Sequence, residues 1–195
     1  NKNDSTLNVI NNSSLNKARL HFIKNKKKGP NEAILTGLEQ TSSDVILVYM
    51  ADDFLNISMI NNMYLKIKNG YDLVIPSRFI YGGTFENKNF FKKIITILGY
   101  ASLVYVAGIP YKDCTNAFKM FSSKILKKIN LKSSKGFTYA LELTIKTHHN
   151  KFNIIELPSK WIELEGRKSN FKVIRWLPYY LYWLMYAILL RIKII

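Results

Sequence analysis

The sequence predicts an α/β domain in which a mostly parallel β-sheet is flanked by helices. Residues 45–49 are a continuous apolar run, as is typical of a strand buried on both faces, and residues 72–76 are predicted to form a second buried strand. Segments with helical periodicity, residues 30–40 and 57–68, alternate with these strands. Such alternation favours a parallel sheet with helices on both of its faces. A chain of 195 residues suffices for one compact domain of this kind.

The other elements follow in order along the chain. Residues 19–23 are a short strand candidate, Pro30 opens the first helix, and Asn69 with Gly70 ends the second. Beyond them we expect a loop over 81–89, a helix over 90–106, a loop over 109–119, helices over 121–129 and 137–149, strands over 154–157 and 160–163, and an aromatic helix over 176–190.

The chain is strongly basic, with 29 Lys and Arg against 13 Asp and Glu and a formal net charge of +16. Compositional drift towards Lys accounts for such an excess without any ligand. Attraction to anionic lipid head groups or to nucleic acid are the functional alternatives. We expect no nucleic-acid partner, because no recognisable reading motif accompanies the charge. A nucleic-acid binder would show an affinity for DNA or RNA that falls steeply with salt.

Cysteine usage and the N-terminal sequence bear on the compartment. Cys114 is the only cysteine, so no disulfide forms within the chain, which fits a reducing compartment. Residues 1–16 are polar and lack the apolar core of a signal peptide. The chain also begins without Met, which suggests a fragment of a longer protein.

Asp52 and Asp53 directly follow the first buried strand. Adjacent carboxylates repel one another unless a cation lies near them, and a hard divalent cation would bridge them to diphosphate oxygens. The plainer alternative is that one of the two caps the helix that follows. The strand context and a nearby arginine favour a metal site at Asp52 and Asp53.

Ser77 and Arg78 follow the second buried strand in the same way. The planar guanidinium of Arg78 matches phosphate oxygens, and a surface salt bridge is the alternative. Ligands of open α/β sheets bind beyond the C-terminal ends of the strands. We therefore expect these side chains and the two aspartates to face one crevice.

Two further carboxylates are candidates for chemistry. Asp113 lies in a predicted loop, residues 113–119, that also carries Thr, Asn and Lys. It can act as a general base towards an acceptor hydroxyl or phosphate, or it can form an Asx turn. Glu142 lies mid-helix on a largely apolar face and needs a partner. The sequence leaves that partner open between substrate and a structural Lys or Arg.

Residues 171–195 are predicted to form a C-terminal amphipathic or membrane-associating helix. The uncharged core, residues 176–190, is shorter than the ~20 residues of a spanning helix. Arg191 and Lys193 follow this core, which indicates anchoring at the membrane interface with Trp and Tyr at head-group depth. The alternative is a buried terminal helix of a soluble domain.

Several motifs occur in a fixed order along most of the chain. Residues 29–38 match a G-x-G-x-A-x-x-x-G helix opening with Asn31 in place of the second Gly. Residues 44–53 resemble a strand running into a D-x-D pair, in which Ala51 takes the first Asp position if Asp53 is the second, so both Asp52 and Asp53 are candidates. The later matches are V-I-G-S-R-Y…G-G at 74–83, D-x-T-[SN]-G-F-[KR] at 113–119, G-F-x-x-x-x-E at 136–142, W-x-[DE]-R-x-x-G-x-S-[KN]-F at 161–171 and W-L-P-x-Y-L-x-W at 176–183. This series resembles glycosyltransferase family 2, in particular the dolichyl- and polyprenyl-phosphate sugar transferases.

The chain departs from this family pattern in further places. Leu164 stands where the family usually has Arg, and Arg167 where it has Gly. The family also begins with a strand and a P-x-Y-N-E turn that help to hold the nucleotide, and residues 3–6 resemble a worn remnant of its next motif, D-D-x-S-T-D. The resemblance therefore implies a GT-A-like domain over residues 1–170 that lacks its first strands.

The resemblance implies transfer of a sugar from a nucleotide diphosphate sugar to a polyprenyl-phosphate or saccharide acceptor, with Mg²⁺ or Mn²⁺ at Asp52 and Asp53. It also implies a place at the cytoplasmic face of a membrane, peripheral or anchored by the C-terminal helix. The expected site residues are Arg78 and Ser77 for the donor diphosphate, Asp113 and Glu142 for catalysis, and Lys92, Lys93, Thr115, Asn116 and Ser169 for the acceptor. The alternative is a catalytically inactive, truncated, membrane-associated remnant of this fold.

Overall fold

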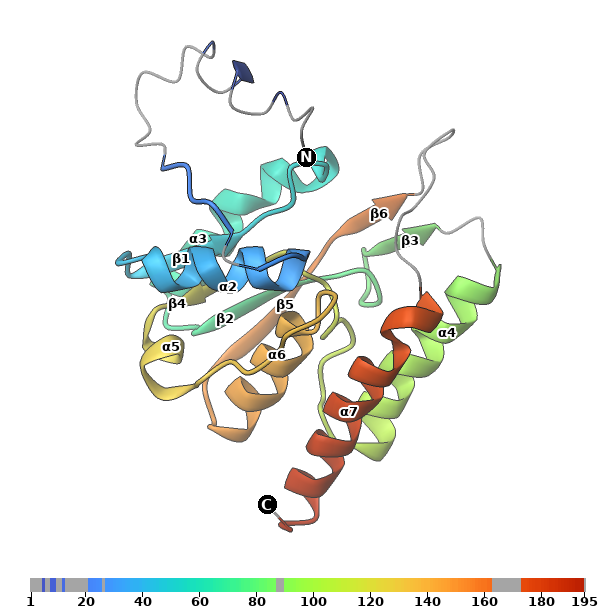
Figure 1. Cartoon of the computed structure of the whole chain (residues 1–195). Coiled ribbons are helices and arrows are strands. Elements are labelled where there is room, and N and C mark those ends of the chain that lie inside the picture. The colour runs from blue at the N-terminus through green and yellow to red at the C-terminus, as the bar shows by residue number, and fades with distance from the viewer. Residues whose placement is uncertain are drawn as a thin grey trace.

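The computed structural model describes residues 5, 8–9, 12, 21–25, 27–86, 90–162 and 173–194 (Figure 1). In chain order its elements are α2 (Pro30–Gln40), β1 (Val45–Val48), the 3-10 helix η1 (Phe54–Met59), α3 (Ile60–Lys68), β2 (Leu73–Ser77), β3 (Thr84–Glu86), α4 (Phe90–Ala101), the π-helix η2 (Ser102–Val106), β4 (Lys119–Ser122), α5 (Lys124–Lys128), α6 (Tyr139–His149), β5 (Ile154–Pro158), β6 (Lys160–Ile162) and α7 (Val173–Arg191).

The first helix begins where the sequence predicts. Gly29 takes a positive φ of 123°, and Pro30 then occupies the first turn of α2, where its missing N–H costs no hydrogen bond. The strand expected over 19–23 is wrong for residues 21–23, which carry no strand, and residues 19–20 lie outside the described part of the chain. The predicted domain boundary at residue 170 also lies outside the described residues.

The main sheet has the strand order β1-β4-β2-β5. β4 runs antiparallel to both β1 and β2, whereas β2 and β5 run parallel. The sheet is therefore mixed, and the expectation of a mostly parallel sheet is wrong. Because β1 and β2 are each antiparallel to β4, they still point in the same direction. Their C-terminal ends therefore lie at the same edge of the sheet.

The sequence pattern did not predict β4 as a strand. Lys119 at its start interrupts the apolar run, and the spacing of Phe121, Ile125 and Ile129 is that of a helical face. The structure instead pairs Phe121 with Ile46 of β1 and buries all four residues of the strand. Only the pairing with two distant strands distinguishes this segment from the start of a helix.

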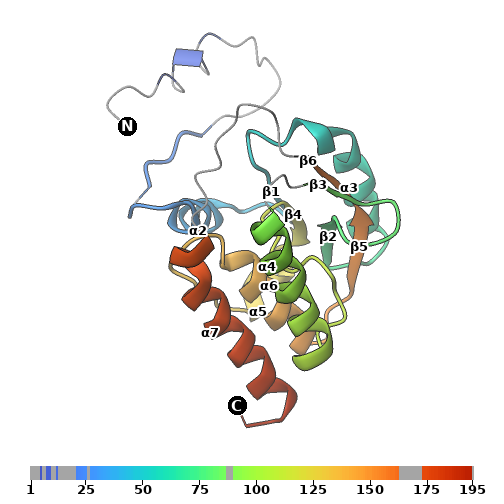
Figure 2. The ribbon, with the colours of Figure 1, turned by 90° about the vertical axis from the view of Figure 1, so that its right-hand side faces the viewer.

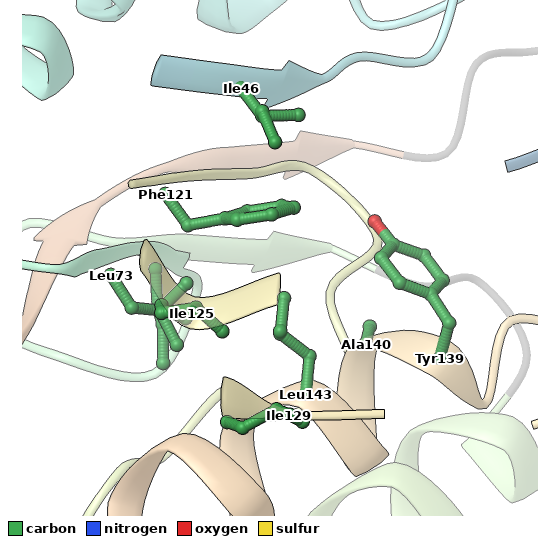
Figure 3. Close-up of a cluster of buried hydrophobic side chains, with 9 residues drawn as sticks. Ile46, Leu73, Phe121, Ile125, Ile129, Tyr139, Ala140 and Leu143 are labelled. Atoms are coloured by element: carbon green, nitrogen blue, oxygen red, sulfur yellow. The ribbon is translucent and has the colours of Figure 1, made fainter. Parts of the chain in front are cut away.

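Helices cover both faces of the main sheet. On one face, Leu73 and Phe121 pack against Ile125 and Leu143 of α5 and α6, in the cluster that Figure 3 shows. On the other face, Met63 of α3 packs with side chains that include Val74 and Phe118. Successive residues of β2 thus point to opposite faces, as the pleat of a strand requires.

A second sheet consists of β3 and β6, which pair in parallel with Thr84 opposite Lys160. The strand over β6 agrees with the prediction, whereas residues 84–86 were expected in a loop. Ser159 joins the two sheets, since its N–H donates to the Ser77 carbonyl at 2.9 Å and its carbonyl accepts the Thr84 N–H at 2.9 Å.

The C-terminal helix α7 lies beside α4 and η2 (Figures 1 and 2). One face of α7 is buried, with Trp183 and Ala187 packed in a cluster with residues of α6 and η2. At its end, Arg191 Nη1 donates to the Tyr105 and Val106 carbonyls at 3.0 and 2.7 Å. Within the described ranges, no helix combines the length and apolar character needed to cross a bilayer.

Candidate functional site

The two predicted clusters follow β1 and β2 at one edge of the main sheet. β1 leads into Asp52 and Asp53, and β2 ends at Ser77, which Arg78 follows. Lys119 is the first residue of β4, which runs the other way between them. The topology therefore brings the two predicted clusters to one edge of the sheet.

Arg78 and Asp113 form a buried ion pair. Arg78 Nε and Nη2 donate to Asp113 Oδ2 and Oδ1 at 2.6 and 2.7 Å, and the Arg78 backbone N–H donates to Oδ2 at 3.0 Å. Side-chain exposure is 14% for Arg78 and 0% for Asp113. Burial acts to lower the pKa of Arg78, but the charge and hydrogen bonds of Asp113 raise it above its ordinary value. Asp113 thus holds the guanidinium, and this geometry gives no support to the predicted role as general base.

The loop that carries Asp113 is fixed to the neighbouring strands. Glu156 Oε1 of β5 accepts the backbone N–H groups of Lys112 and Asp113 at 3.0 Å each. Asn116 Nδ2 donates to the Pro76 carbonyl at 2.8 Å. Asn116, predicted to bind the acceptor, therefore ties the loop to the end of β2, while Thr115 is partly exposed.

Aromatic rings surround the guanidinium of Arg78. Its carbon Cζ lies 5.2 Å from the centroid of Phe79 and 5.1 Å from that of Phe85. Phe79 stacks on Tyr100 of α4, and Phe85 of β3 contacts Trp161 of β6. These distances fall within the range of cation–π attraction. The rings and Asp113 together restrict the orientation of the guanidinium.

Lys119 is a buried cation near this ion pair. Its side chain is fully buried, and within the described residues Lys119 Nζ and Ser77 Oγ have no hydrogen-bond partner. Burial lowers the pKa of Lys119 to about 8, against the opposing effect of Cys114, Asp113 and Glu156. The sequence places Lys119 in the loop motif but gives no sign that its ammonium is buried.

Asp53 is half-buried and Asp52 is exposed. Burial raises the pKa of Asp53 and so does the charge of Asp52, whereas hydrogen bonds from Asn56 act in the opposite direction. Burial likewise raises the pKa of Tyr49, and the charges of Asp53 and Asp52 add to that effect. Negative charge therefore accumulates at this end of β1, as a cation site requires.

Two carboxylates fit a magnesium- or manganese-type ion that shares its coordination with a substrate. Such ions keep several waters and are held by one or two carboxylates plus substrate phosphates. Across the described ranges, no group of three or more His, Cys, Asp and Glu side chains is placed to hold a metal. Asp52 and Asp53 alone are thus the protein ligands on which the predicted site depends.

Hydrogen bonds connect Asp53 with the end of β2. Asn56 Nδ2 donates to Asp53 Oδ1 at 2.7 Å and to the Lys160 carbonyl at 2.9 Å. The preceding residue, Ser159, donates its N–H to the Ser77 carbonyl at 2.9 Å. Residues 159 and 160 therefore link Asp53, after β1, with Ser77 at the end of β2.

Glu142 has partners of its own, away from this ion pair. Both of its oxygens accept the Lys132 N–H, at 2.7 and 2.9 Å, and Oε2 accepts the N–H and hydroxyl of Ser133 at 2.7 and 2.6 Å. Its carboxylate also pairs with Lys146 one helical turn later. With 0% exposure and these donors, Glu142 anchors the loop before α6. The geometry answers the open question of its partner in favour of a structural lysine and gives no support to a catalytic role.

The other predicted residues are placed less closely. Lys93 is exposed in the first turn of α4, Lys92 lies beside it in the same turn, and Ser169 lies outside the described residues. A cavity of about 400 Å³ lies elsewhere, between α2 and residues 126–131, and none of the predicted site residues lines it. Asn56 and Glu156 are the site residues that the sequence analysis missed, because Lys160, a partner of Asn56, and Asp113, a partner of Glu156, lie 104 and 43 positions away along the chain.

Comparison with known proteins identifies relatives of this chain. The family model of glycosyl transferase family 2 matches residues 1–130. A dolichol-phosphate mannosyltransferase from Pyrococcus furiosus is 31% identical over 137 residues, 68% of this chain and 38% of that protein. A polyprenol monophosphomannose synthase from Mycolicibacterium smegmatis is 25% identical over 174 residues, 81% of this chain and 66% of that protein. The chain thus spans less than two thirds of the length of either relative.

Solved structures share the fold. Glucosyl-3-phosphoglycerate synthase from Mycobacterium tuberculosis in complex with UDP aligns with a TM-score of 0.59 and 13% identity, over 83% of this chain and 56% of that one. The same enzyme with Mn²⁺, UDP and glucosyl-3-phosphoglycerate aligns with a TM-score of 0.54. At this identity the likeness shows the GT-A type of α/β fold alone. Together with the family match, it shows that the chain belongs to glycosyl transferase family 2 and resembles the polyprenyl-phosphate sugar transferases within it.

Proposed function

We propose that this protein transfers a sugar from a nucleotide diphosphate sugar to a polyprenyl phosphate, with a saccharide hydroxyl as the less favoured acceptor. The observation that carries this proposal is the Arg78 guanidinium. Asp113 holds it in a bidentate pair at the end of β2, at the same sheet edge as the aspartates that follow β1. A fixed guanidinium at the same sheet edge as a pair of carboxylates suits a substrate that carries phosphate groups and a divalent cation.

The state of Asp113 favours a phosphate acceptor. A hydroxyl nucleophile needs a base to take its proton. Asp113, the predicted base, already accepts three hydrogen bonds from Arg78. A phosphate monoester is largely ionised at neutral pH, since its second pKa is about 6, and therefore attacks without such a base.

The proposed reaction is a single displacement. An acceptor phosphate oxygen forms a bond to the anomeric carbon of the sugar while the bond from that carbon to the diphosphate oxygen breaks. The electron pair leaves with the nucleoside diphosphate. Arg78 would offset the charge that develops on phosphate oxygens, and fixed donors of this kind supply a large part of such catalysis. Asp52 and Asp53 would hold Mg²⁺ or Mn²⁺, which when bound neutralises the leaving diphosphate.

A membrane surface is the proposed setting. Exposed apolar side chains lie on α4, on η2 and on α7, and Figure 2 shows α4 and α7 side by side. We call this set the α4–α7 surface: Phe90, Phe91, Leu98, Tyr105, Leu181, Tyr182 and Met185. Lys93 and Arg175 are exposed on the same helices, and Lys193 follows them. Apolar area flanked by cations suits an anionic lipid surface. We place the protein at the cytoplasmic face, in keeping with its single reduced cysteine.

A transfer assay on the full chain tests this proposal. Vesicles containing a short polyprenyl phosphate would be incubated with Mn²⁺ and a panel of radiolabelled nucleotide diphosphate sugars, and label in the extracted lipid would be counted. We expect label from one donor with the parent chain and at least about 100-fold less with Arg78→Ala or Asp53→Ala. Label in an added saccharide but not in the lipid would contradict the acceptor assignment.

The same preparation separates activity from binding. If a nucleotide diphosphate sugar with Mn²⁺ raises the thermal midpoint of the chain but no acceptor receives sugar, the chain is an inactive member of the family. If neither binding nor transfer occurs with any donor of the panel, the proposed function is wrong for this chain.

A further inference from the structure

Asn56, in η1, is a buried amide that joins two distant parts of the site. Its side chain is 6% exposed. It donates to Asp53 Oδ1 at 2.7 Å and to the Lys160 carbonyl at 2.9 Å, and its oxygen accepts the Lys160 N–H at 2.9 Å. Three of the four hydrogen-bonding positions of the amide are therefore occupied.

The β6 backbone determines which way this amide faces. The Lys160 N–H requires the amide oxygen, and the Lys160 carbonyl requires the amide NH₂. The flipped amide would set donor against donor and oxygen against oxygen at both contacts. Asn56 must therefore present its second N–H to the Asp53 carboxylate. This orientation follows from a strand 104 residues away and not from η1 itself.

From this arrangement we propose that Asn56 is a positioning residue, which holds the Asp53 carboxylate for a divalent cation and takes its own orientation from β6. The inference rests on the proposed function, because it assumes that Asp53 serves as a cation ligand. Partners that orient metal ligands in this way typically contribute about 10–100-fold to metal affinity. If Asn56 only filled the turn before α3, its substitution would change the free energy of unfolding and leave the cation affinity unchanged.

The support from β6 extends to Arg78. Ser159, the residue before β6, donates its N–H to the Ser77 carbonyl, next to Arg78 in the chain. One short backbone segment, residues 159–160, therefore carries hydrogen bonds towards both halves of the site. Asn56 is the link on the carboxylate side of that segment.

A double-mutant cycle on the full chain tests this inference. Mn²⁺ alone would be titrated, with free ion measured by electron paramagnetic resonance, into the parent, Asn56→Leu, Asp53→Asn and the double variant. We expect Asn56→Leu to raise the Kd for Mn²⁺ about tenfold in the parent and less than about twofold in the Asp53→Asn background, because the amide acts through Asp53. Asn61→Leu, at an exposed position of α3, is the matched control and should leave the Kd unchanged.

Two further outcomes are decisive. An equal loss of Mn²⁺ affinity in both backgrounds, or none in either, would overturn the positioning role. An Asp53→Asn variant that binds Mn²⁺ like the parent would instead overturn the cation role of Asp53, and with it that part of the proposed function. Should Asn56→Leu fail to fold by circular dichroism, Asn56→Gln keeps the amide but displaces it by one methylene. Parental Mn²⁺ affinity in that variant would also overturn the inference.

Discussion

At the scale of single residues, the site depends on how each charge is held. Arg78 is fixed by a carboxylate and by two aromatic rings, whereas Lys119 is fully buried near this pair and has no hydrogen-bond partner for its ammonium among the described residues. The two cations therefore differ in what a substitution removes. Loss of Asp113 would leave the Arg78 guanidinium without its carboxylate partner, whereas loss of Lys119 would remove the desolvation penalty of a buried ammonium.

Asp113→Asn should weaken both folding and transfer. The substitution leaves a buried guanidinium facing a neutral amide, and breaking a buried pair costs about 3–5 kcal/mol of the free energy of unfolding. Because the guanidinium also loses its fixed orientation, transfer should decrease about 100-fold. Urea unfolding and the lipid-transfer assay measure the two effects. Asp44→Asn, at an exposed position, serves as the control. Parental stability in the Asp113 variant would show that the ion pair is not formed in solution.

Lys119→Met should change the pH dependence of stability. Burial lowers the pKa of Lys119 to about 8 from its ordinary 10.5. Between these values the unfolded chain binds more protons than the folded chain, so the parent should gain stability as the pH rises from 8 to 10.5. The Met variant should lose this rise and be the more stable of the two below pH 8.

Urea unfolding at a series of pH values from 7 to 10.5 measures this effect, with Lys124→Met at an exposed position as the control. Stability curves of parent and Lys119→Met that run parallel over this range would show that the ammonium is not desolvated.

At the scale of elements, the sequence predicts those that depend on a local pattern and misses those that depend on pairing with distant strands. The apolar runs of β1 and β2 and the Gly-Pro start of α2 depend on neighbouring residues, and these elements were predicted correctly. β4 escaped prediction because a lysine begins it and helical spacing follows it. Its antiparallel course is set by two partner strands, which no local pattern contains.

The candidate site divides in the same way. The sequence predicted that the residues after β1 and β2 share one edge, because strand direction alone requires it. It could not show that Asp113 accepts hydrogen bonds from Arg78 or that Asn56 contacts Lys160, because these residues are 35 and 104 positions apart. Two partners of Glu142, Lys132 and Ser133, lie ten and nine residues before it, but they belong to a loop, which leaves no periodic signal.

Glu142→Gln should act on stability rather than on chemistry. The substitution turns an amide NH₂ towards backbone N–H donors of the loop before α6 and leaves buried groups unpaired, which costs about 1–3 kcal/mol. Transfer per folded molecule should stay within about threefold of the parent, because Glu142 is fully buried among structural partners. Glu86→Gln, at an exposed position, is the control. A loss of transfer near 100-fold in a fully folded variant would restore a catalytic role to Glu142.

At the scale of the whole molecule, surface chemistry differs from one side to another. The α4–α7 surface is apolar with flanking cations, whereas α3 exposes Tyr64 and Leu65, which do not belong to this surface. Figures 1 and 2 show α4 and α7 side by side. The site edge connects with this surface through Tyr100 of α4, which stacks on Phe79 beside Arg78.

Leu181→Asp should weaken binding to vesicles of mixed neutral and anionic phospholipid. Leu181 is 48% exposed on α7, and inserting a carboxylate in place of an apolar side chain should reduce vesicle affinity about tenfold or more. Co-sedimentation with vesicles measures the effect. Leu65→Asp, 57% exposed on α3, is the matched control and should bind as the parent does. Equal binding by both variants would mean that α7 does not face lipid.

Cys114 gives this molecule a built-in reporter of its own opening. The thiol is buried among residues of α6, α7 and η2, and burial raises its pKa to about 12. Reagents that alkylate thiolates should therefore react very slowly with Cys114 while the molecule is closed. Since the chain has no second cysteine, the rate of alkylation reads out how often the helices around Cys114 separate. Comparing that rate with and without vesicles would show whether lipid contact tightens or loosens this part of the protein, without any added label.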